Sequence, residues 1–329
     1  MEVRPMARRR LPPAFAMKRP RSAANGSPEV IGLGCVAVDE LLFVPRYPGR
    51  DARQPLRRHQ RQCGGLTATA LVAAARLGVR AAYAGRLGEG DDSAFVLKTF
   101  EREGVDTSRV VRRRGVRVVH AFVVVEEETQ TRTILYDLGE GSGADPRLPE
   151  RGWIQSAKVL LVDRWGLRGM VRAARAAREA GVAVVGDLEN GDDPLFDELV
   201  ALADHLVVPE AFVRRRVGTD DPAEGARRLW REDRAVVIVT CGREGCWVYD
   251  GAGAPWHQPA FSVKVVDTTG CGDVFHGAYA AALARGLPLR ERVREAAAAA
   301  ALKATRLGGQ AGIPTRRELA RFLRERPAA

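Results

Sequence analysis

Short runs of β-branched and apolar residues alternate with longer alanine-rich runs along most of this chain. Strands are expected at 30–38, 81–85, 159–162, 182–185, 205–208 and 236–240. Helices are expected at 68–77, 93–103, 170–180 and 223–232. This order is typical of βαβ units, in which helices cover a mainly parallel sheet. The pattern therefore predicts an α/β fold with a mainly parallel central sheet flanked by helices.

Two further β runs do not follow this rhythm. Residues 116–125 and 131–137 alternate β-forming residues around the polar stretch 126–130, which predicts a hairpin outside the main sheet. The sequence shows no internal repeat of fixed period and no low-complexity linker in its interior. We expect one compact domain over residues 28–329.

The net charge of +11 is concentrated at the start of the sequence. Residues 1–27 carry a net charge of +6, contain several prolines and show no helical period. They are predicted to form a disordered basic extension. The remaining charge is spread thinly over the rest of the chain, which argues against nucleic acid as a partner.

Membrane and metal signals are both weak. No apolar run approaches the roughly 20 residues that cross a bilayer, and no secretory signal is evident. The five cysteines form no C-x-x-C pair, so neither a zinc site nor a disulfide framework is indicated. These features predict a soluble cytoplasmic protein with no membrane partner.

The most specific motif is Asp267-Thr-Thr-Gly-Cys-Gly-Asp273. It lies between the apolar run 263–266 and a segment, 275–283, whose apolar residues have helical spacing. Gly270 and Gly272 permit a tight turn at the start of that helix. The amides of such a turn can converge on an anion, so we expect this anion site to be formed by Gly270, Cys271 and Gly272.

Asp273 lies at the predicted start of the helix. The positive end of the helix dipole favours its ionised form, and a carboxylate beside a bound phosphate chain can take the proton of an attacking alcohol. We therefore expect Asp273 to act as the general base of phosphoryl transfer. The alternative is that Asp273 only caps the helix and the glycines only turn the chain.

The motif resembles the C-terminal signature of the PfkB-type, or ribokinase-like, carbohydrate kinases. Gly64-Gly65-Leu-Thr-Ala-Thr-Ala70, followed by residues 73–78, resembles the N-terminal signature of the same family. Gly32-Leu-Gly34 with Asp39, and residues 85–91, resemble its first strands and loops. The resemblance runs from about Glu29 into the C-terminal region. It implies a ribokinase-like fold with a small β lid over the sugar, formed by segments near 43–62 and 114–138.

This resemblance implies an ATP-dependent sugar kinase that uses Mg²⁺. Asp39, Gly64 and Gly65 would lie against the sugar, although Asp39 could equally be a turn residue at a strand end. Relatives commonly dimerise through the lid, which makes a homodimer plausible here.

The resemblance also implies a nucleotide site late in the chain. Thr240, Gly242 and Gly245 resemble the nucleotide-binding loop of the family, although glycines so placed also form simple turns. Thr268 and Asn190 are the other ATP-binding candidates. Asp267, with the stretch 304–312, matches a region that in some relatives holds a monovalent cation.

Some positions depart from the family pattern. Thr69 stands where the N-terminal signature normally has asparagine, so sugar contacts there must differ. The usual Asn-x-x-Glu element for Mg²⁺ appears as Pro209-Glu-Ala-Phe212, which leaves Glu210 as the candidate for the metal. The stretch 187–190 only partly resembles the element that reaches the nucleotide.

Three features resemble the sulfofructose-kinase-like branch: Thr69, the Asp163-Arg-Trp165 strand end, and the tract that runs from 257–259 through 273–277 to 309–314. An arginine facing the sugar could pair with a sulfonate or phosphate substituent, so Arg164 and Arg53 are candidates for binding an anionic sugar. The alternative is that both arginines are surface residues that form ion pairs.

Two other functions compete with that of a sugar kinase. A nucleoside kinase would use the same fold and base, and a non-catalytic sugar sensor would keep the fold alone. A dinucleotide oxidoreductase is disfavoured because Gly32-x-Gly34 lacks the third glycine of the Rossmann fingerprint. No P-loop motif occurs in the sequence.

Overall fold

A computed structural model of the protein describes residues 26–129 and 131–326. Its centre is an eight-stranded sheet in the order β14-β13-β12-β11-β10-β9-β1-β4, parallel except for the β12-β13-β14 edge. The strands are β1 Val30–Gly32, β4 Ala81–Tyr83, β9 Val159–Val162, β10 Ala183–Asp187, β11 His205–Pro209, β12 Val236–Thr240, β13 Cys246–Tyr249 and β14 Trp256–Gln258. The predicted α/β fold is confirmed. The predicted basic extension 1–27 lies outside the described residues except for its last two.

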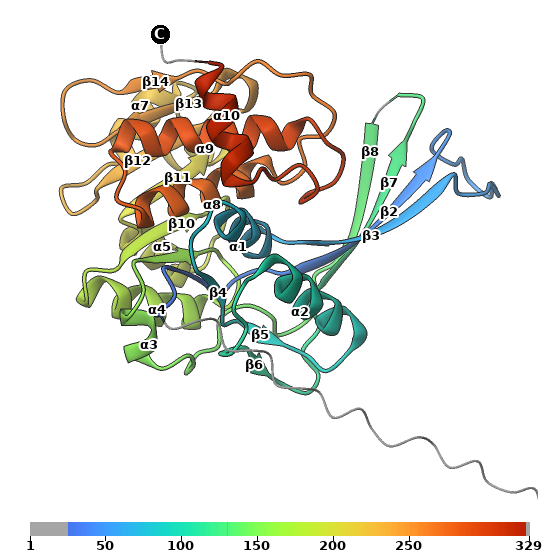
Figure 1. The fold of residues 1–329 in the computed structure, drawn as a ribbon, viewed down its shortest axis with the longest axis horizontal. Helices are drawn as coiled ribbons and strands as arrows, with labels where there is room; N and C mark the ends of the chain where they lie inside the picture. Colours follow the sequence, from blue (N-terminus) through green and yellow to red (C-terminus); the bar gives the residue numbers. More distant parts are fainter. Residues whose placement is uncertain (1–25, 130, 327–329) are drawn as a thin grey trace, which may run out of the picture.

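Helices cover both faces of this sheet (Figure 1). Side chains of a strand alternate between faces, so Val159 and Leu161 enter one core while Leu160 and Val162 enter the other. The first core is closed by α1 Leu66–Arg76, α2 Asp91–Glu103, α8 Cys271–Ala284, α9 Leu289–Ala304 and α10 Arg316–Arg324. The second is closed by α3 Arg151–Gln155, α4 Leu167–Glu179, α5 Pro194–Leu202, α6 Glu210–Val217 and α7 Pro222–Leu229.

A second sheet of four strands, here called the small sheet, stands out to one side of the molecule (Figure 1). Its order is β3 Arg58–Gly64, β2 Ala37–Val44, β7 Val119–Glu126 and β8 Thr131–Asp137. One face carries a buried apolar cluster, Leu41, Phe43, Ala121 and Val123, against which Leu307 of the main body packs. That face is therefore turned toward the main body. A separate pair, β5 Arg86–Leu87 and β6 Val111–Arg112, completes the strands.

The prediction of a single strand over residues 30–38 is wrong. The structure divides it into β1, in the central sheet, and the start of β2, in the small sheet. The chain leaves the central sheet at Gly34, where a side chain would collide with Asp163, and the Cys35 amide donates to Asp163 Oδ2 at 2.7 Å. An apolar run does not encode such a change of sheet, so the sequence prediction joined the two strands.

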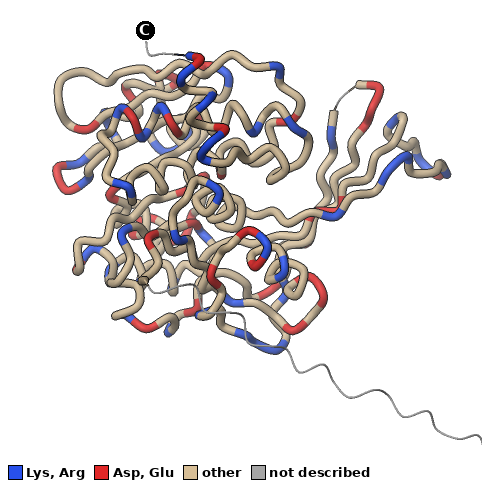
Figure 2. The backbone as a smooth tube through the Cα atoms, viewed as in Figure 1, with Lys and Arg blue, Asp and Glu red and all other residues tan. Residues whose placement is uncertain are grey.

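Basic and acidic residues are interspersed along the helices and loops (Figure 2). Among the helices that the structure describes, none is long and apolar enough to span a bilayer.

Candidate active site

The turn before α8, here called the glycine turn, contains Gly270, Cys271 and Gly272. Gly270 caps the helix with φ 77°, and a Cβ there would lie 2.8 Å from the Gly309 carbonyl oxygen, so a larger residue would be strained. A Cβ at Gly272 would meet nothing within 4 Å, which leaves open space over the helix start. The Cys271 amide donates to the Thr268 carbonyl at 3.1 Å. Gly272 is thus the position of the turn where a ligand can approach the backbone closely.

A cavity of about 620 Å³ opens above this turn. It extends from the end of β12 across the segment 260–265 to α8 and α9. Its lining includes six residues predicted to bind the nucleotide or its phosphates, Thr240, Gly242, Gly245, Thr268, Cys271 and Gly272. Asn190 is not part of this lining.

Asp273 lies in the first turn of α8, beneath the same turn of glycines. Burial raises the pKa of Asp273 well above its usual value, and the neighbouring Asp187 carboxylate raises it further, while His276 acts in the opposite direction. A raised pKa makes the carboxylate a stronger proton acceptor once it is ionised. The position therefore combines a half-buried base with an anion-binding helix start.

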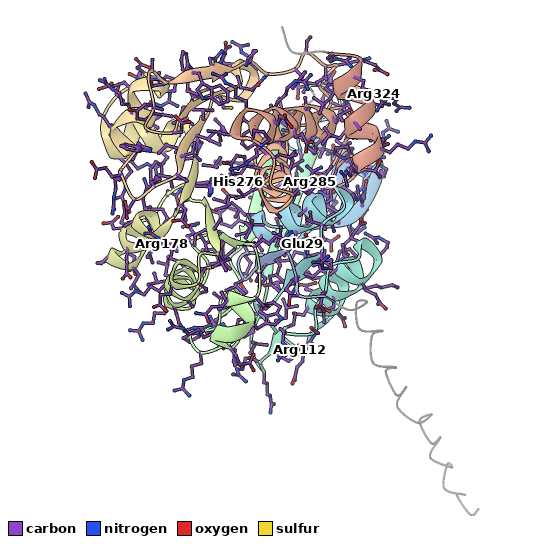
Figure 3. All side chains as sticks on the ribbon, turned by 60° about the vertical axis from the view of Figure 1, so that its left-hand side comes forward. Glu29, Arg112, Arg178, His276, Arg285 and Arg324 are labelled. Carbon is purple, nitrogen blue, oxygen red and sulfur yellow. The ribbon has the colours of Figure 1, made fainter. Side chains whose placement is uncertain are left out.

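His276 is one turn further along α8 and lies near the middle of the molecule, whereas Arg112, Arg178 and Arg324 lie toward its periphery (Figure 3). Its Nδ1 is 2.8 Å from the Gly272 carbonyl oxygen and 3.5 Å from Asp187 Oδ2, and its Nε2 is 3.1 Å from the Val207 carbonyl oxygen. Both ring nitrogens therefore face main-chain carbonyl oxygens, and a ring with one N–H can donate to only one of them.

No sequence motif predicted a role for His276, and for Asp187 there was only the partial resemblance of the stretch 187–190 to an element that reaches the nucleotide. The available signal was a histidine three residues after Asp273, within a helix that is otherwise apolar at the positions facing the sheet.

Asp39 is on the face of the small sheet that is turned toward the main body. It shares this face with Leu41, and the strand register places Gln62 beside it. A Cβ at Gly64 would lie 2.4 Å from Asp39 Oδ2, so the bare glycine leaves room for this carboxylate. Burial raises the pKa of Asp39 to about 6, against a hydrogen bond from Gln62 that lowers it. The Asp39 charge in turn contributes to raising the pKa of Asp273, so the two carboxylates belong to one site.

Comparison with known proteins decides the family. The family model "pfkB family carbohydrate kinase" matches residues 35–316, most of the chain. The chain belongs to the pfkB family of carbohydrate kinases. It is therefore a phosphotransferase with an alcohol acceptor, and more narrowly a sugar kinase.

Individual relatives agree with this assignment. The ribokinase of Haemophilus influenzae is 29% identical over 88% of this chain and 97% of its own length. Fructokinase-1 of Oryza sativa subsp. japonica is 28% identical over 91% of this chain and 99% of its own. The structure of Arabidopsis thaliana ribokinase, complexed with ribose and ATP, superposes with a TM-score of 0.79 at 24% identity, covering 90% of this chain and 98% of that one. These matches show the family and the ribokinase-like fold; they do not show the sulfofructose-kinase-like branch.

Several predicted sugar contacts of the kinase have other partners in the structure. Gly65 begins α1 with φ 95°, and a Cβ there would lie 2.7 Å from Val36 Cα, so the turn itself requires glycine. Thr69 is buried, and its hydroxyl accepts a hydrogen bond from Gln310 Nε2 at 3.4 Å. The family signature has asparagine at position 69, and in this chain the side-chain amide of Gln310 lies beside that position instead.

The two candidate arginines are both exposed. Arg53 lies in the loop between β2 and β3. Arg164 follows β9, with its guanidinium carbon 5.7 Å from the centroid of the Trp165 ring. Neither side chain lines the cavity above α8.

Glu210 is the first residue of α6, and its carboxylate lies 3.7 Å from Arg214 Nη1. It is half-exposed and does not line the cavity. Within residues 26–129 and 131–326, no group of three histidine, cysteine or acidic side chains forms a cluster suited to a metal.

The Asp267 side chain is fully occupied. Its Oδ1 accepts from the Thr269 amide and from Arg132 Nη1 of β8, each at 2.8 Å, and its Oδ2 accepts from the Gly308 amide at 2.8 Å. Although burial alone would raise it, the amides of Thr269 and Gly308 hold the pKa of Asp267 below its usual value. Asp267 therefore ties the glycine turn to β8 and to the loop after α9.

Proposed function

We propose that this kinase transfers the γ-phosphate of ATP to a hydroxyl of a small sugar, with Asp273 as the general base. The observation that carries the proposal is the position of Asp273. It is half-buried in the first turn of α8, next in the chain to Cys271 and Gly272 of the cavity lining, and the Asp39 carboxylate is close enough to influence its pKa. A base so placed lies where a nucleotide and an alcohol would meet.

The proposed reaction begins with a sugar hydroxyl beside Asp273. Asp273 accepts the hydroxyl proton as the oxygen bonds to the γ-phosphorus, and the bond from that phosphorus to ADP breaks. The amides of the glycine turn, with the dipole of α8, stabilise negative charge on the transferred group. The His276 ring lies beneath this turn, with its Nδ1 3.5 Å from Asp187 Oδ2, and it acts to lower the pKa of Asp273.

Asp187 is the residue best suited to hold the Mg²⁺ that accompanies ATP. Its Oδ2 is buried and has no hydrogen-bond partner among the described residues, and a carboxylate oxygen is the ligand that Mg²⁺ prefers. Glu210 is the weaker candidate because its side chain is half-exposed on α6 and does not line the cavity. When bound, the metal would neutralise charge on the β- and γ-phosphate oxygens.

The acceptor that we propose is a small sugar with a primary hydroxyl, a ketose or a sulfosugar. Asp39 and Gln62, side by side on the inner face of the small sheet, offer an acceptor and an amide for sugar hydroxyls. An anionic substituent would reach Arg164 at the end of β9 rather than Arg53, which lies in the outer loop. A nucleoside kinase of the same fold is the alternative.

The experiment is an ADP-release assay with a panel of ketoses, aldopentoses, sulfosugars and nucleosides. The proposal expects turnover with at least one sugar, and turnover with nucleosides alone would contradict it. In Asp273→Asn we expect turnover to fall by about 10² to 10⁴-fold, with nucleotide binding retained, because a general base has been removed.

The matched control for Asp273→Asn is Asp193→Asn. Asp193 also starts a helix, and its side chain accepts from the Leu195 amide at 2.8 Å, but it caps α5 on the opposite face of the sheet. Asparagine caps a helix about as well as aspartate, so this control should keep both its stability and its turnover. Equal turnover in the two variants would show that Asp273 only caps α8.

A further inference from the structure

The ammonium of Lys303 is bound inside the protein. Lys303 is the penultimate residue of α9, its side chain is 0% exposed, and its Nζ donates to the main-chain carbonyl of Asp267 at 2.7 Å. Lysine is almost never fully buried unless its charge is compensated. Here the ammonium lies at the first residue of the catalytic motif; burial lowers the pKa of Lys303, and Cys271 and Asp267 act in the opposite direction.

This is the region where the sequence led us to expect a monovalent cation. Such a cation needs main-chain carbonyl oxygens that replace its hydration shell. The Asp267 carbonyl already accepts from Lys303, and the Ala304 carbonyl accepts from the amides of Val266 and Asp267 at 2.8 and 3.1 Å. The residues present therefore do not fit a free monovalent cation at this position.

We propose that the Lys303 ammonium replaces this cation, so that the kinase works without potassium or any other monovalent ion. An ammonium is a compact point charge with three donors. Attached to α9, it is present at every turnover and at every salt concentration.

The proposed role of Lys303 is to position the glycine turn. Lys303 holds the Asp267 carbonyl, and the Asp267 side chain holds Thr269 and Gly308 on either side of it. Gly270 in turn packs against Gly309, where a Cβ would have only 2.8 Å. Lys303 thus acts on the reacting phosphate through the turn and not by touching the phosphate.

The first test uses the wild-type kinase. Turnover is measured at constant ionic strength in tetramethylammonium chloride, whose cation is too large for a carbonyl site, and then in KCl, NH₄Cl and NaCl. The proposal expects the four rates to agree within about twofold. Activation by K⁺ of about tenfold or more would overturn it, because the kinase would then need a bound monovalent cation that the Lys303 ammonium does not replace.

The second test removes the ammonium. Lys303→Ala leaves a space beside the Asp267 carbonyl, so we expect kcat to fall by about 100-fold through misplacement of the turn and to be restored in part by KCl or NH₄Cl. Lys303→Met loses the charge but fills the space, so the same loss without restoration is expected. Loss in both variants with no cation response in either would overturn the replacement role.

The control is Lys158→Ala. Lys158 also donates to a main-chain carbonyl, that of Ala284 at 3.1 Å, but at the opposite end of α8 from the glycine turn. No cation response is expected in this variant.

The inference rests on the proposed function only where turnover is the readout. Thermal melting supplies an independent readout: replacing tetramethylammonium by K⁺ should raise the Tm of Lys303→Ala by about 2 °C or more, and should leave the wild type and Lys303→Met unchanged. If no sugar is phosphorylated, the proposed function fails while this arm still decides the role of Lys303. Should Lys303→Ala not fold, the wild-type salt series and Lys303→Met decide it.

Discussion

At the scale of single residues, the site depends on where positive charge is placed around buried carboxylates. His276 lowers the pKa of Asp273, and Asp273 must be ionised to accept a proton. His276→Asn removes this charge, so the pKa of Asp273 should rise and the acidic limb of the kcat/KM profile should move to higher pH. We expect a shift of about one pH unit, measured by ADP release between pH 5 and 9.

The control for this histidine is His205→Asn. His205 is also buried, and its Nδ1 lies 2.9 Å from the Tyr279 hydroxyl of the same helix, α8. Its replacement should reduce stability and leave the pH profile in place. A shift of equal size in both variants would mean that His276 acts only through the packing of α8.

At the scale of secondary-structure elements, β3 ends in Gly64, whose lack of a side chain leaves room for the Asp39 carboxylate. Gly64→Ala would place a Cβ 2.4 Å from Asp39 Oδ2 and displace the carboxylate. We expect KM for the sugar to rise about tenfold or more, the effect of overpacking by a kcal/mol or two, while KM for ATP stays within about twofold. Gly49→Ala, in the β2–β3 loop where a Cβ meets nothing within 4 Å, should change neither constant. Equal sugar KM values for Gly64→Ala and wild type would contradict the assigned role of Asp39.

Elements also show what the sequence could and could not predict. The glycine turn, Asp273 and the Thr240 loop are local motifs, and their backbone requirements can be read from residue types alone. The strand 30–38 could not be divided from its sequence, because an apolar run fits either sheet. Lys303 and His276 bind main-chain carbonyls of distant segments. Every residue type has the same main-chain carbonyl group, so the acceptor leaves no mark in the sequence. No sequence pattern marks such contacts in a single chain.

At the scale of the whole molecule, exposed apolar side chains gather on the small sheet. Seven of the nine large exposed apolar residues among those described lie within residues 47–138, and Leu135 and Tyr136 of β8 are 56% and 65% exposed. Exposed apolar side chains on an edge strand favour association. We propose that two copies of the kinase pair through β8 and its neighbours.

This proposal predicts that sedimentation velocity at micromolar concentration will give a dimer. Leu135→Arg should shift the protein to the monomer because it buries an unpaired charge at the contact. Ala254→Arg, which adds the same charge to an exposed loop beyond β13, should leave the dimer intact. A wild-type protein that sediments as a monomer at all concentrations would contradict the pairing.

The ion pair between Arg132 and Asp267 joins β8, at the edge of the small sheet, to the turn proposed to bind the phosphate. In the proposed function, the sugar binds the inner face of the small sheet and the nucleotide binds the turn, so this ion pair lies between the two ligands. Thermodynamic linkage then demands symmetry: the factor by which bound sugar tightens nucleotide must equal the factor by which bound nucleotide tightens sugar. Arg132→Ala removes this ion pair and should reduce both coupling factors equally.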